Sequence, residues 1–172
     1  QIPGSPPYAN MVANNGSDFF AEVDIALAQQ LLADAGVETP IDVRFHFADN
    51  NPRRASQYDL IAASAAEAGF NVIDGRSATW GAELSSPEIY DASMFAWIST
   101  AVDIAGSQAN FVCDGQNNFG LYCNPLVDEL YSQLTSETDP DEQQRLLVEI
   151  EQQLWADAFG TTIYQFPTIT AF

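Results

Sequence analysis

The sequence predicts an α/β domain in which a parallel or mixed sheet is covered by helices. Apolar residues recur at helical spacing in four segments, and short alternating or apolar stretches stand between the earlier ones. A strand, helix, strand succession favours a parallel or mixed sheet, because the connecting helix returns the chain to the end of the sheet at which the first strand began. One domain is expected at a length of 172 residues.

The first quarter of the chain predicts a helix and a strand after an irregular start. Residues 1–18 contain three prolines and several Gly, Asn and Ser, which indicate an irregular entry segment rather than a helix or strand. Apolar residues at helical spacing predict a helix from Asp24 to Ala35, with Gly36 ending it. The alternation of apolar and polar residues from Ile41 to Phe47 predicts a strand with one face inward.

A second helix and two more strands follow. Asn51 and Pro52 are typical of a helix start, and Gly69 of its end. Arg53 and Arg54 are unfavourably placed for the helix dipole, so we expect a solvated helix end, with contact to a partner or another lobe as the alternative. The apolar stretches from Phe70 to Ile73 and from Ser93 to Ile98 fit strands.

Cys113 and Cys123 are the two cysteines of the chain and stand ten residues apart in a loop rich in Gly, Asn and Gln. An even pair without a His cluster nearby predicts a disulfide rather than a metal site. Two unpaired buried thiols are the alternative. A disulfide favours an oxidising, extracytoplasmic location.

Two helices are predicted after the cysteine loop. Asn124 and Pro125 predict the start of the first, whose apolar face carries Leu126, Val127, Leu130, Tyr131 and Leu134. Asp139 and Pro140 start the second, where Glu142 occupies the position of a capping-box carboxylate, and Leu146, Leu147, Ile150 and Leu154 share a face. Residues 161–172 are rich in β-forming residues, but Pro167 excludes a central strand, so we expect a strand leaving the domain.

The composition excludes several classes of partner. Twenty-four acidic residues against five arginines, no lysine and one histidine give a net charge of −19, which disfavours nucleic acid and anionic membranes. This negative charge mainly promotes solubility, and it is also compatible with a cationic ligand. No apolar run reaches membrane-spanning length, and the chain begins at Gln1 without a signal-like segment, which indicates mature protein or an excised piece.

The order of motifs resembles the C-terminal lobe of the extracellular solute-binding proteins of family 5, the oligopeptide- and dipeptide-binding receptors of ABC importers. About 150 of the 172 residues share in it. The motifs are ALAQQLLADAG, ADNN, PRRASQYDLIAASAAEAGFNV, SATWGAEL, YDASMFAW, CNPLVDELYSQL and DPDEQQRLLVEIEQQLWADAF. The resemblance implies one lobe of a type II periplasmic-binding-protein-like fold, a mixed sheet flanked by helices. Residues 1–18 are then a hinge segment, 19–160 the lobe core and 161–172 a return strand toward an N-terminal lobe.

The resemblance also implies site residues. Trp80 matches a tryptophan that borders the ligand pocket in dipeptide binders, and Trp97 matches the tryptophan that precedes the ligand-contacting loop. The aspartate that pairs with a peptide's α-amino group is replaced by Thr100, which cannot neutralise an ammonium, so Asp103 is the nearest substitute. Ordinary core positions for the tryptophans and a loop or capping role for Asp103 are the alternatives. The cysteine pair matches one found in dipeptide-binding members, which strengthens the disulfide prediction.

The function implied is that of a substrate-binding component of an ABC importer, which captures peptides or a related small solute between two lobes and works with permease subunits. No catalysis, metal or cofactor is expected, since His46 lacks a second imidazole or thiolate. The full-length protein is expected in the periplasm or lipid-anchored at the cell surface. A secreted structural or adhesive module is one alternative. A hydrolase using Glu83 with Glu88 or Asp91 as a carboxylate pair is another.

Overall fold

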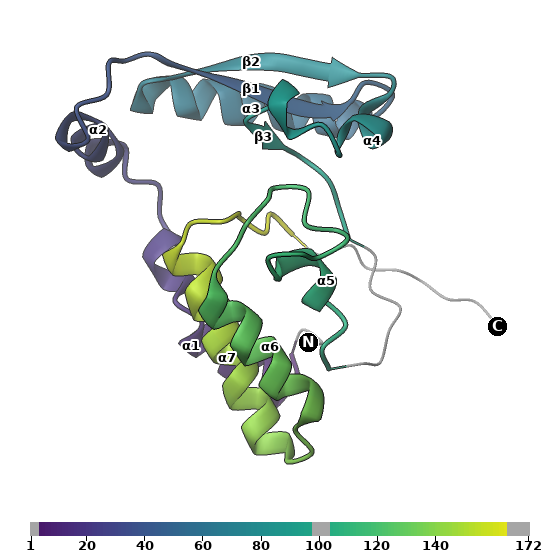
Figure 1. Ribbon diagram of the computed structural model, residues 1–172. Helices are drawn as coiled ribbons and strands as arrows, with labels where there is room; N and C mark the ends of the chain where they lie inside the picture. The colour runs from purple at the N-terminus through teal and green to yellow at the C-terminus, as the bar shows by residue number, and fades with distance from the viewer. Residues whose placement is uncertain (1–3, 98–103, 165–172) are drawn as a thin grey trace. The chain divides into compact units, whose positions relative to one another are not determined.

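The computed structural model describes residues 4–97 and 104–164. The chain divides into two compact units. The first comprises residues 1–21, 103–115 and 122–172, and the second comprises residues 22–102 and 116–121. Each unit is described by itself (Figure 1).

The second unit is built on a parallel three-stranded sheet. Its strands are β1 (Ile41–Ala48), β2 (Phe70–Ser77) and β3 (Ala92–Ser93), in the order β2-β1-β3. Strand β1 pairs with β2 along its whole length, from Ile41 opposite Phe70 to Ala48 opposite Ser77. Strand β3 pairs with only two residues of β1, Phe45 and His46. The predicted α/β class is confirmed, and of the two predicted sheet types, parallel or mixed, the strands of the described residues form the parallel one.

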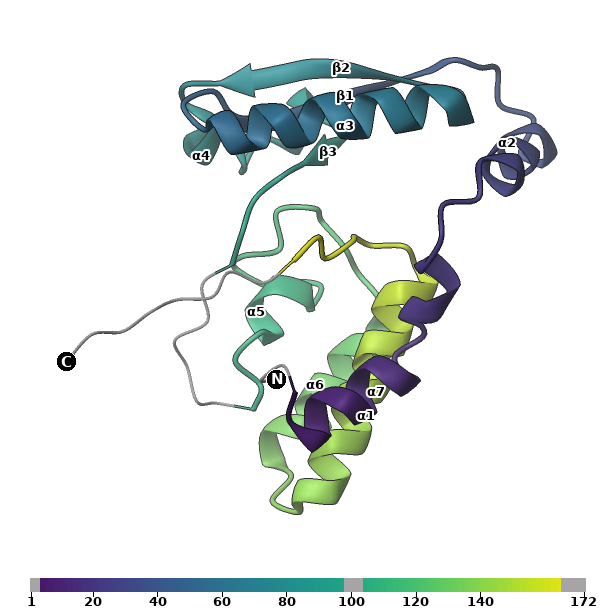
Figure 2. The ribbon, with the colours of Figure 1, turned by 180° about the vertical axis from the view of Figure 1, so that it is seen from behind.

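Helix α3 (Pro52–Ala68) covers one face of this sheet, as Figures 1 and 2 show from opposite sides. The predicted signals set its ends: the Asn51 side chain accepts from the backbone N–H of Arg54 at 3.2 Å, and Gly69 ends it at a φ of 100°. Tyr58 packs against the rings of Phe45 and Phe47, and its hydroxyl donates to the carbonyl of Val72 at 2.9 Å. The helix is thereby fixed to both β1 and β2.

Three short helical segments complete the second unit: α2 (Ile25–Asp34), α4 (Trp80–Glu83) and η2 (Pro87–Ile89). Asp24 caps α2 by accepting from the N–H of Leu27 at 2.8 Å, and Gly36 follows the helix at a positive φ of 68°. The side-chain amide of Gln29 donates to the Glu67 carbonyl at 2.7 Å, which joins α2 to the end of α3.

The first unit is helical. It contains α1 (Pro6–Asn14), η1 (Ser17–Phe20), α5 (Gln108–Phe111), α6 (Pro125–Ser136) and α7 (Pro140–Ala156). Helices α6 and α7 lie side by side, and α1 packs along α7 (Figures 1 and 2). Burial of apolar side chains from both long helices stabilises the unit. Its buried core is formed by Ala105, Val127, Leu130, Tyr131, Leu134, Leu146 and Ile150.

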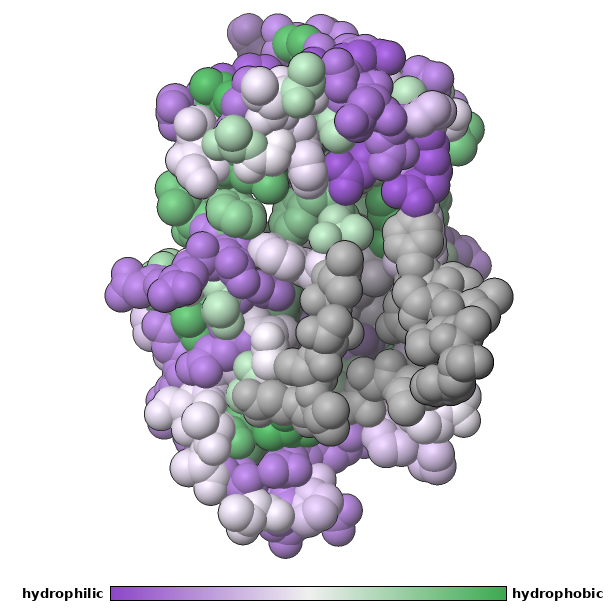
Figure 3. Space-filling view, turned by 90° about the vertical axis from the view of Figure 1, so that its right-hand side faces the viewer, coloured by the Kyte–Doolittle hydropathy of each residue, from purple (hydrophilic) through white to green (hydrophobic). Residues whose placement is uncertain are grey.

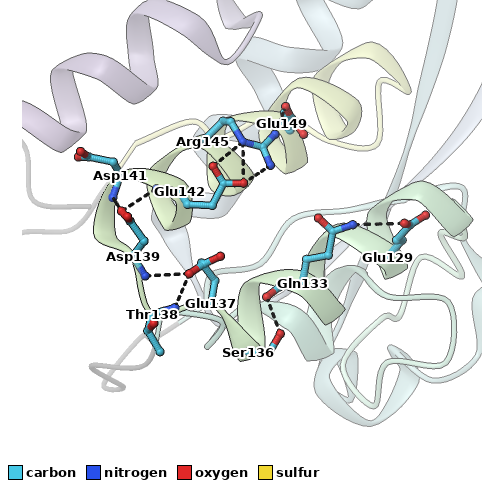
Figure 4. Close-up of polar contacts among 10 residues, drawn as sticks. All are labelled: Glu129, Gln133, Ser136, Glu137, Thr138, Asp139, Asp141, Glu142, Arg145 and Glu149. Carbon is cyan, nitrogen blue, oxygen red and sulfur yellow. Dashed lines mark hydrogen bonds and ion pairs between the residues drawn. The ribbon is translucent and has the colours of Figure 1, made fainter.

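The connection between α6 and α7 is held by polar contacts, drawn in Figure 4. Asp139 caps α7 as predicted, accepting from the N–H groups of Asp141 at 2.9 Å and Glu142 at 3.4 Å. The predicted capping box is wrong. The Glu142 carboxylate binds Arg145, and the N–H of Asp139 donates instead to Glu137 at 2.8 Å.

Three other predictions of local structure differ from the described residues. The hinge segment 1–18 is not irregular throughout, because Pro6 and Pro7 occupy the first turn of α1 and Ser5 caps it. The strand predicted from Ser93 to Ile98 is short: β3 ends at Ser93, the N–H of Met94 still donates to the His46 carbonyl at 2.9 Å, and residues 94–97 are not in a strand. Residues 161–164 are not in a strand, while the remainder of the predicted return strand lies outside the described residues.

Hydrophilic residues cover much of the face shown in Figure 3, and hydrophobic residues form smaller patches. Within residues 4–97 and 104–164, no helix is both long and apolar enough to cross a membrane.

Candidate functional site

The candidate site lies at the carboxyl ends of the parallel strands, where open α/β sheets place their ligands. Helix α3 starts four residues after β1, Trp80 follows β2 by three residues, and the segment from Met94 to Trp97 follows β3 directly. The sheet therefore brings three segments, far apart in sequence, to one edge.

Trp80 is held by groups from the two neighbouring segments. The indole Nε1 donates to the Ser93 hydroxyl at 3.3 Å, and that hydroxyl in turn donates to the His46 carbonyl at 3.1 Å. The guanidinium carbon of Arg54 lies 4.3 Å from the centroid of the Trp80 ring, which is a cation–π contact. Arg54 is only 9% exposed, so the solvated helix end expected for it is wrong, whereas Arg53 is exposed.

Trp97 belongs to a cluster of three aromatic side chains. Its ring lies parallel to that of Phe119, with 10° between the planes and 6.0 Å between the centroids. The ring of Phe95 stands perpendicular to the indole at 5.1 Å. Despite these contacts, 44% of Trp97 remains exposed, so it is not an ordinary core residue.

Phe119 was not singled out from the sequence, although it lies between the two cysteines. Its carbonyl oxygen is 3.2 Å from the hydroxyl of Tyr90, and its neighbour Asn118 is buried. One sequence feature could have indicated Phe119: it is an aromatic residue among the polar and glycine residues of the loop that the disulfide closes. Its partner cannot be read from the sequence, because Trp97 lies 22 positions earlier.

His46 lies on the sheet face opposite Phe45 and Phe47, as the alternation predicts, but it is buried rather than solvated. Its ring stacks on Tyr90 with 5.3 Å between centroids. Nδ1 lies 2.9 Å from the Gly75 carbonyl, and Nε2 lies 3.2 Å from a carboxylate oxygen of Glu83. The histidine therefore links β1 to β2 and to α4.

Two of the three carboxylates proposed for a hydrolase, Glu83 and Asp91, are committed to other partners. Hydrogen bonds from Ser77 and Thr79 hold the pKa of Glu83 below its usual value. Asp91 forms a bidentate ion pair with Arg44, whose guanidinium donates a hydrogen bond to each carboxylate oxygen. These hydrogen bonds lower the pKa of Asp91 to about 2. A general acid needs a raised pKa, so neither Glu83 nor Asp91 suits that role.

Cys113 and Cys123 are joined by a disulfide, which confirms the pairing predicted from the sequence. The N–H of Cys113 donates to Asp128 on α6 at 2.9 Å, so the base of the loop is anchored to that helix.

Thr100 and Asp103 lie outside the described residues, so their predicted ligand contacts stay predictions. Asp114 is exposed in the disulfide loop. In the part of the chain that the structure describes, no group of three or more His, Cys, Asp or Glu side chains is placed to hold a metal ion.

Known proteins with similar sequence or structure are receptors for solutes. No protein-family profile matches the chain. The oligopeptide-binding protein OppA, from both Mycobacterium tuberculosis and Mycobacterium bovis, is 26% identical over 82 residues, which are 48% of this chain and 14% of OppA.

Two solved structures are similar over more of the chain. NikA from Staphylococcus aureus, in complex with Ni(L-His)2, has a TM-score of 0.70 and 21% identity, over 77% of this chain and 30% of NikA. AppA from Bacillus subtilis, in complex with a nonapeptide, has a TM-score of 0.69 and 20% identity, over 79% of this chain and 30% of AppA. The chain thus spans less than a third of each of these proteins. It is a partial homologue of the oligopeptide-binding protein OppA, and its fold is that of the family 5 solute-binding proteins.

Proposed function

We propose that this chain is the ligand-binding lobe of a substrate-binding protein that serves an ABC importer, and that it captures peptides or a related small solute. The observation that carries the proposal is the half-exposed Trp97, fixed by two aromatic neighbours beyond the carboxyl end of β3. Exposed aromatic rings at such an edge are suited to hold a ligand. AppA, which shares this fold, has a nonapeptide bound.

The proposal includes the other lobe and the transporter. An N-terminal lobe of the same full-length protein supplies the opposite wall of the ligand cleft, and permease subunits receive the ligand. The protein binds its ligand without turnover. Its place is outside the cytoplasmic membrane, in the periplasm or lipid-anchored at the surface, which agrees with the disulfide.

Within this lobe, we assign ligand contact to Trp97, Thr100 and Asp103, with Trp80 at the edge of the cleft. Asp103 supplies negative charge to an amine-bearing ligand, because the neutral Thr100 cannot. Asp91, the other aspartate near the end of a strand, is already paired with Arg44 in an ion pair that lowers its pKa to about 2, which supports the choice of Asp103. The net charge of −19 favours cationic ligands over anionic ones.

Thermal unfolding of the full-length protein against a library of peptides and sugars tests the proposal. A ligand that binds the folded state raises the melting temperature by linkage, by an amount that grows with its concentration. We expect peptides with a free α-amino group to raise it, and the same peptides to remain intact after incubation. A library in which no peptide or small solute raises the melting temperature, or in which peptides are cleaved, contradicts the proposal.

A further inference from the structure

Phe119 differs from the other aromatic residues near the sheet edge because it comes from the disulfide loop. Its ring lies against Trp97, and its backbone is held separately: the Phe119 carbonyl oxygen is 3.2 Å from the Tyr90 hydroxyl. Tyr90 is buried, stacks on His46 and approaches the Leu84 carbonyl at 2.8 Å. The position of the loop therefore does not depend on the Phe119 ring alone.

The three rings of the cluster leave one side of the indole uncovered by the other two. The Phe95 and Phe119 centroids are 6.5 Å apart, close to the 5.1 Å and 6.0 Å that separate each from Trp97. The three centroids thus form a nearly equilateral triangle, so Phe95 and Phe119 do not enclose the indole from opposite faces. The large exposed fraction of Trp97 is consistent with this arrangement.

Phe119 also determines the tilt of the indole. Parallel rings resist rotation about the Trp97 side-chain torsions, since any rotation would break the stacking or press the indole into Phe95. A side chain that is held in advance loses less conformational freedom when a ligand arrives, which increases affinity. Two aromatic rings in a stacked or edge-to-face arrangement attract each other beyond the effect of their buried area. An indole held in this way therefore binds a ligand with an aromatic ring more tightly than an equally apolar ligand without one.

We propose that Phe119 is a specificity-determining positioning residue, which holds the Trp97 indole so that its uncovered side stacks on an aromatic side chain of a peptide ligand. This inference rests on the proposed function and adds the class of side chain that the lobe selects. The net negative charge of the chain adds a second selectivity, because it disfavours ligands with Asp or Glu at that position.

The test compares two tripeptides that differ only in one Phe or Leu side chain, titrated calorimetrically into the full-length protein. The readout is the ratio of the two Kd values. We expect the wild type to prefer the Phe peptide by about 3- to 10-fold, the range that one aromatic pair supplies. Phe119→Leu should bring the ratio close to one, and Phe119→Tyr should retain it because the ring remains.

A matched control removes an aromatic pair elsewhere. Phe111→Leu in the first unit breaks the contact of Phe111 with Phe159, whose centroids are 5.6 Å apart, and should leave the ratio unchanged. Melting temperatures are measured for every variant, and Phe119→Met replaces Phe119→Leu if the latter does not fold.

The outcomes separate this inference from the function on which it rests. If the wild type binds both peptides and the folded Leu or Met variant keeps the wild-type ratio, or Phe111→Leu abolishes it, Phe119 has no positioning role. If the wild type binds neither tripeptide nor any peptide in the thermal library, the proposed function fails as well.

Discussion

The guanidinium carbon of Arg54 lies 4.3 Å from the centroid of the Trp80 ring, and this contact joins the start of α3 to the segment that follows β2. The hydrogen bond from Trp80 Nε1 to the Ser93 hydroxyl adds β3 to the same junction. Trp80 therefore has a structural role at the edge of the sheet, whatever it contributes to ligand binding. The half-buried state of its side chain is compatible with both roles.

Truncation of Trp80 should destabilise the fold more than removal of its hydrogen bond alone. We expect Trp80→Ala to lower the free energy of unfolding by about 2 kcal/mol, below the range for a wholly buried tryptophan. Trp80→Phe keeps a ring against Arg54 and should cost about 1 kcal/mol through the lost hydrogen bond. Urea denaturation measures both values. If Trp80→Ala and the wild type had equal free energies of unfolding, the contacts of Trp80 with Arg54 and Ser93 would contribute nothing to stability.

The ion pair of Asp91 with Arg44 should make stability depend on pH in the acid range. The pKa of Asp91 is lowered from 3.8 to about 2, so its contribution is present above 3.8 and is lost as pH falls toward 2. The pair is 42–44% exposed, so solvent screening limits the contribution to below about 1 kcal/mol. Asp91→Asn should therefore lower stability at neutral pH and should converge with the wild type in acid.

The control for that prediction is Asp114→Asn, which removes the same charge from an exposed loop position. Its unfolding free energy should follow the wild type at each pH. A stability difference for Asp91→Asn that is as large at pH 2 as at pH 7, or that is absent at pH 7, would contradict the role of the ion pair.

The disulfide should stabilise the first unit by restricting the unfolded chain. For a loop of about ten residues, the entropic estimate is about 2 to 3 kcal/mol. The double variant Cys113→Ala with Cys123→Ala should lose that amount in denaturant unfolding. Thiol titration of the denatured, unreduced wild type should detect no reactive thiol, and two thiols per chain would show that the bond does not form.

Asp103→Asn in the full-length protein should weaken binding of an amine-bearing peptide by about 1.5 to 3 kcal/mol, as expected for a charge-assisted hydrogen bond. The melting temperature of the unliganded variant should match the wild type. The same peptide with an acetylated amine is the control, because it cannot carry the charge that Asp103 pairs with. An equal loss for both peptides, or no loss for either, would assign Asp103 a structural role.

Local signals in the sequence were sufficient where a short stretch of chain decides the structure. Asn51, Asn124 and Asp139 each stand before a proline, and each caps a helix as predicted. The apolar face of α6 is buried as predicted at four of its five positions, whereas Leu126 is 45% exposed. Helix ends and faces depend on neighbours within a few residues, which explains this success.

Features that depend on distant residues were not predictable in this way. One local signal was overlooked as well, because Ser5 caps α1 with Pro6 and Pro7 in its first turn, the same arrangement of a capping residue before a proline. The charge of Arg54 indicated solvent, but Trp80 covers its guanidinium from another segment. Phe119 meets Trp97 only after the chain has folded, so the aromatic cluster has no signature in either segment alone.

Calorimetric titration of one peptide into the full-length protein and into the 172-residue chain tests most directly whether the ligand is enclosed between this lobe and another. We expect micromolar or tighter binding to the full-length protein, and binding weaker than about 100 μM to the chain alone, because roughly half of the contacts are then missing. Sub-micromolar binding to the chain alone would place the whole site within these residues. That result, or the absence of binding to the full-length protein, would contradict the two-lobed site.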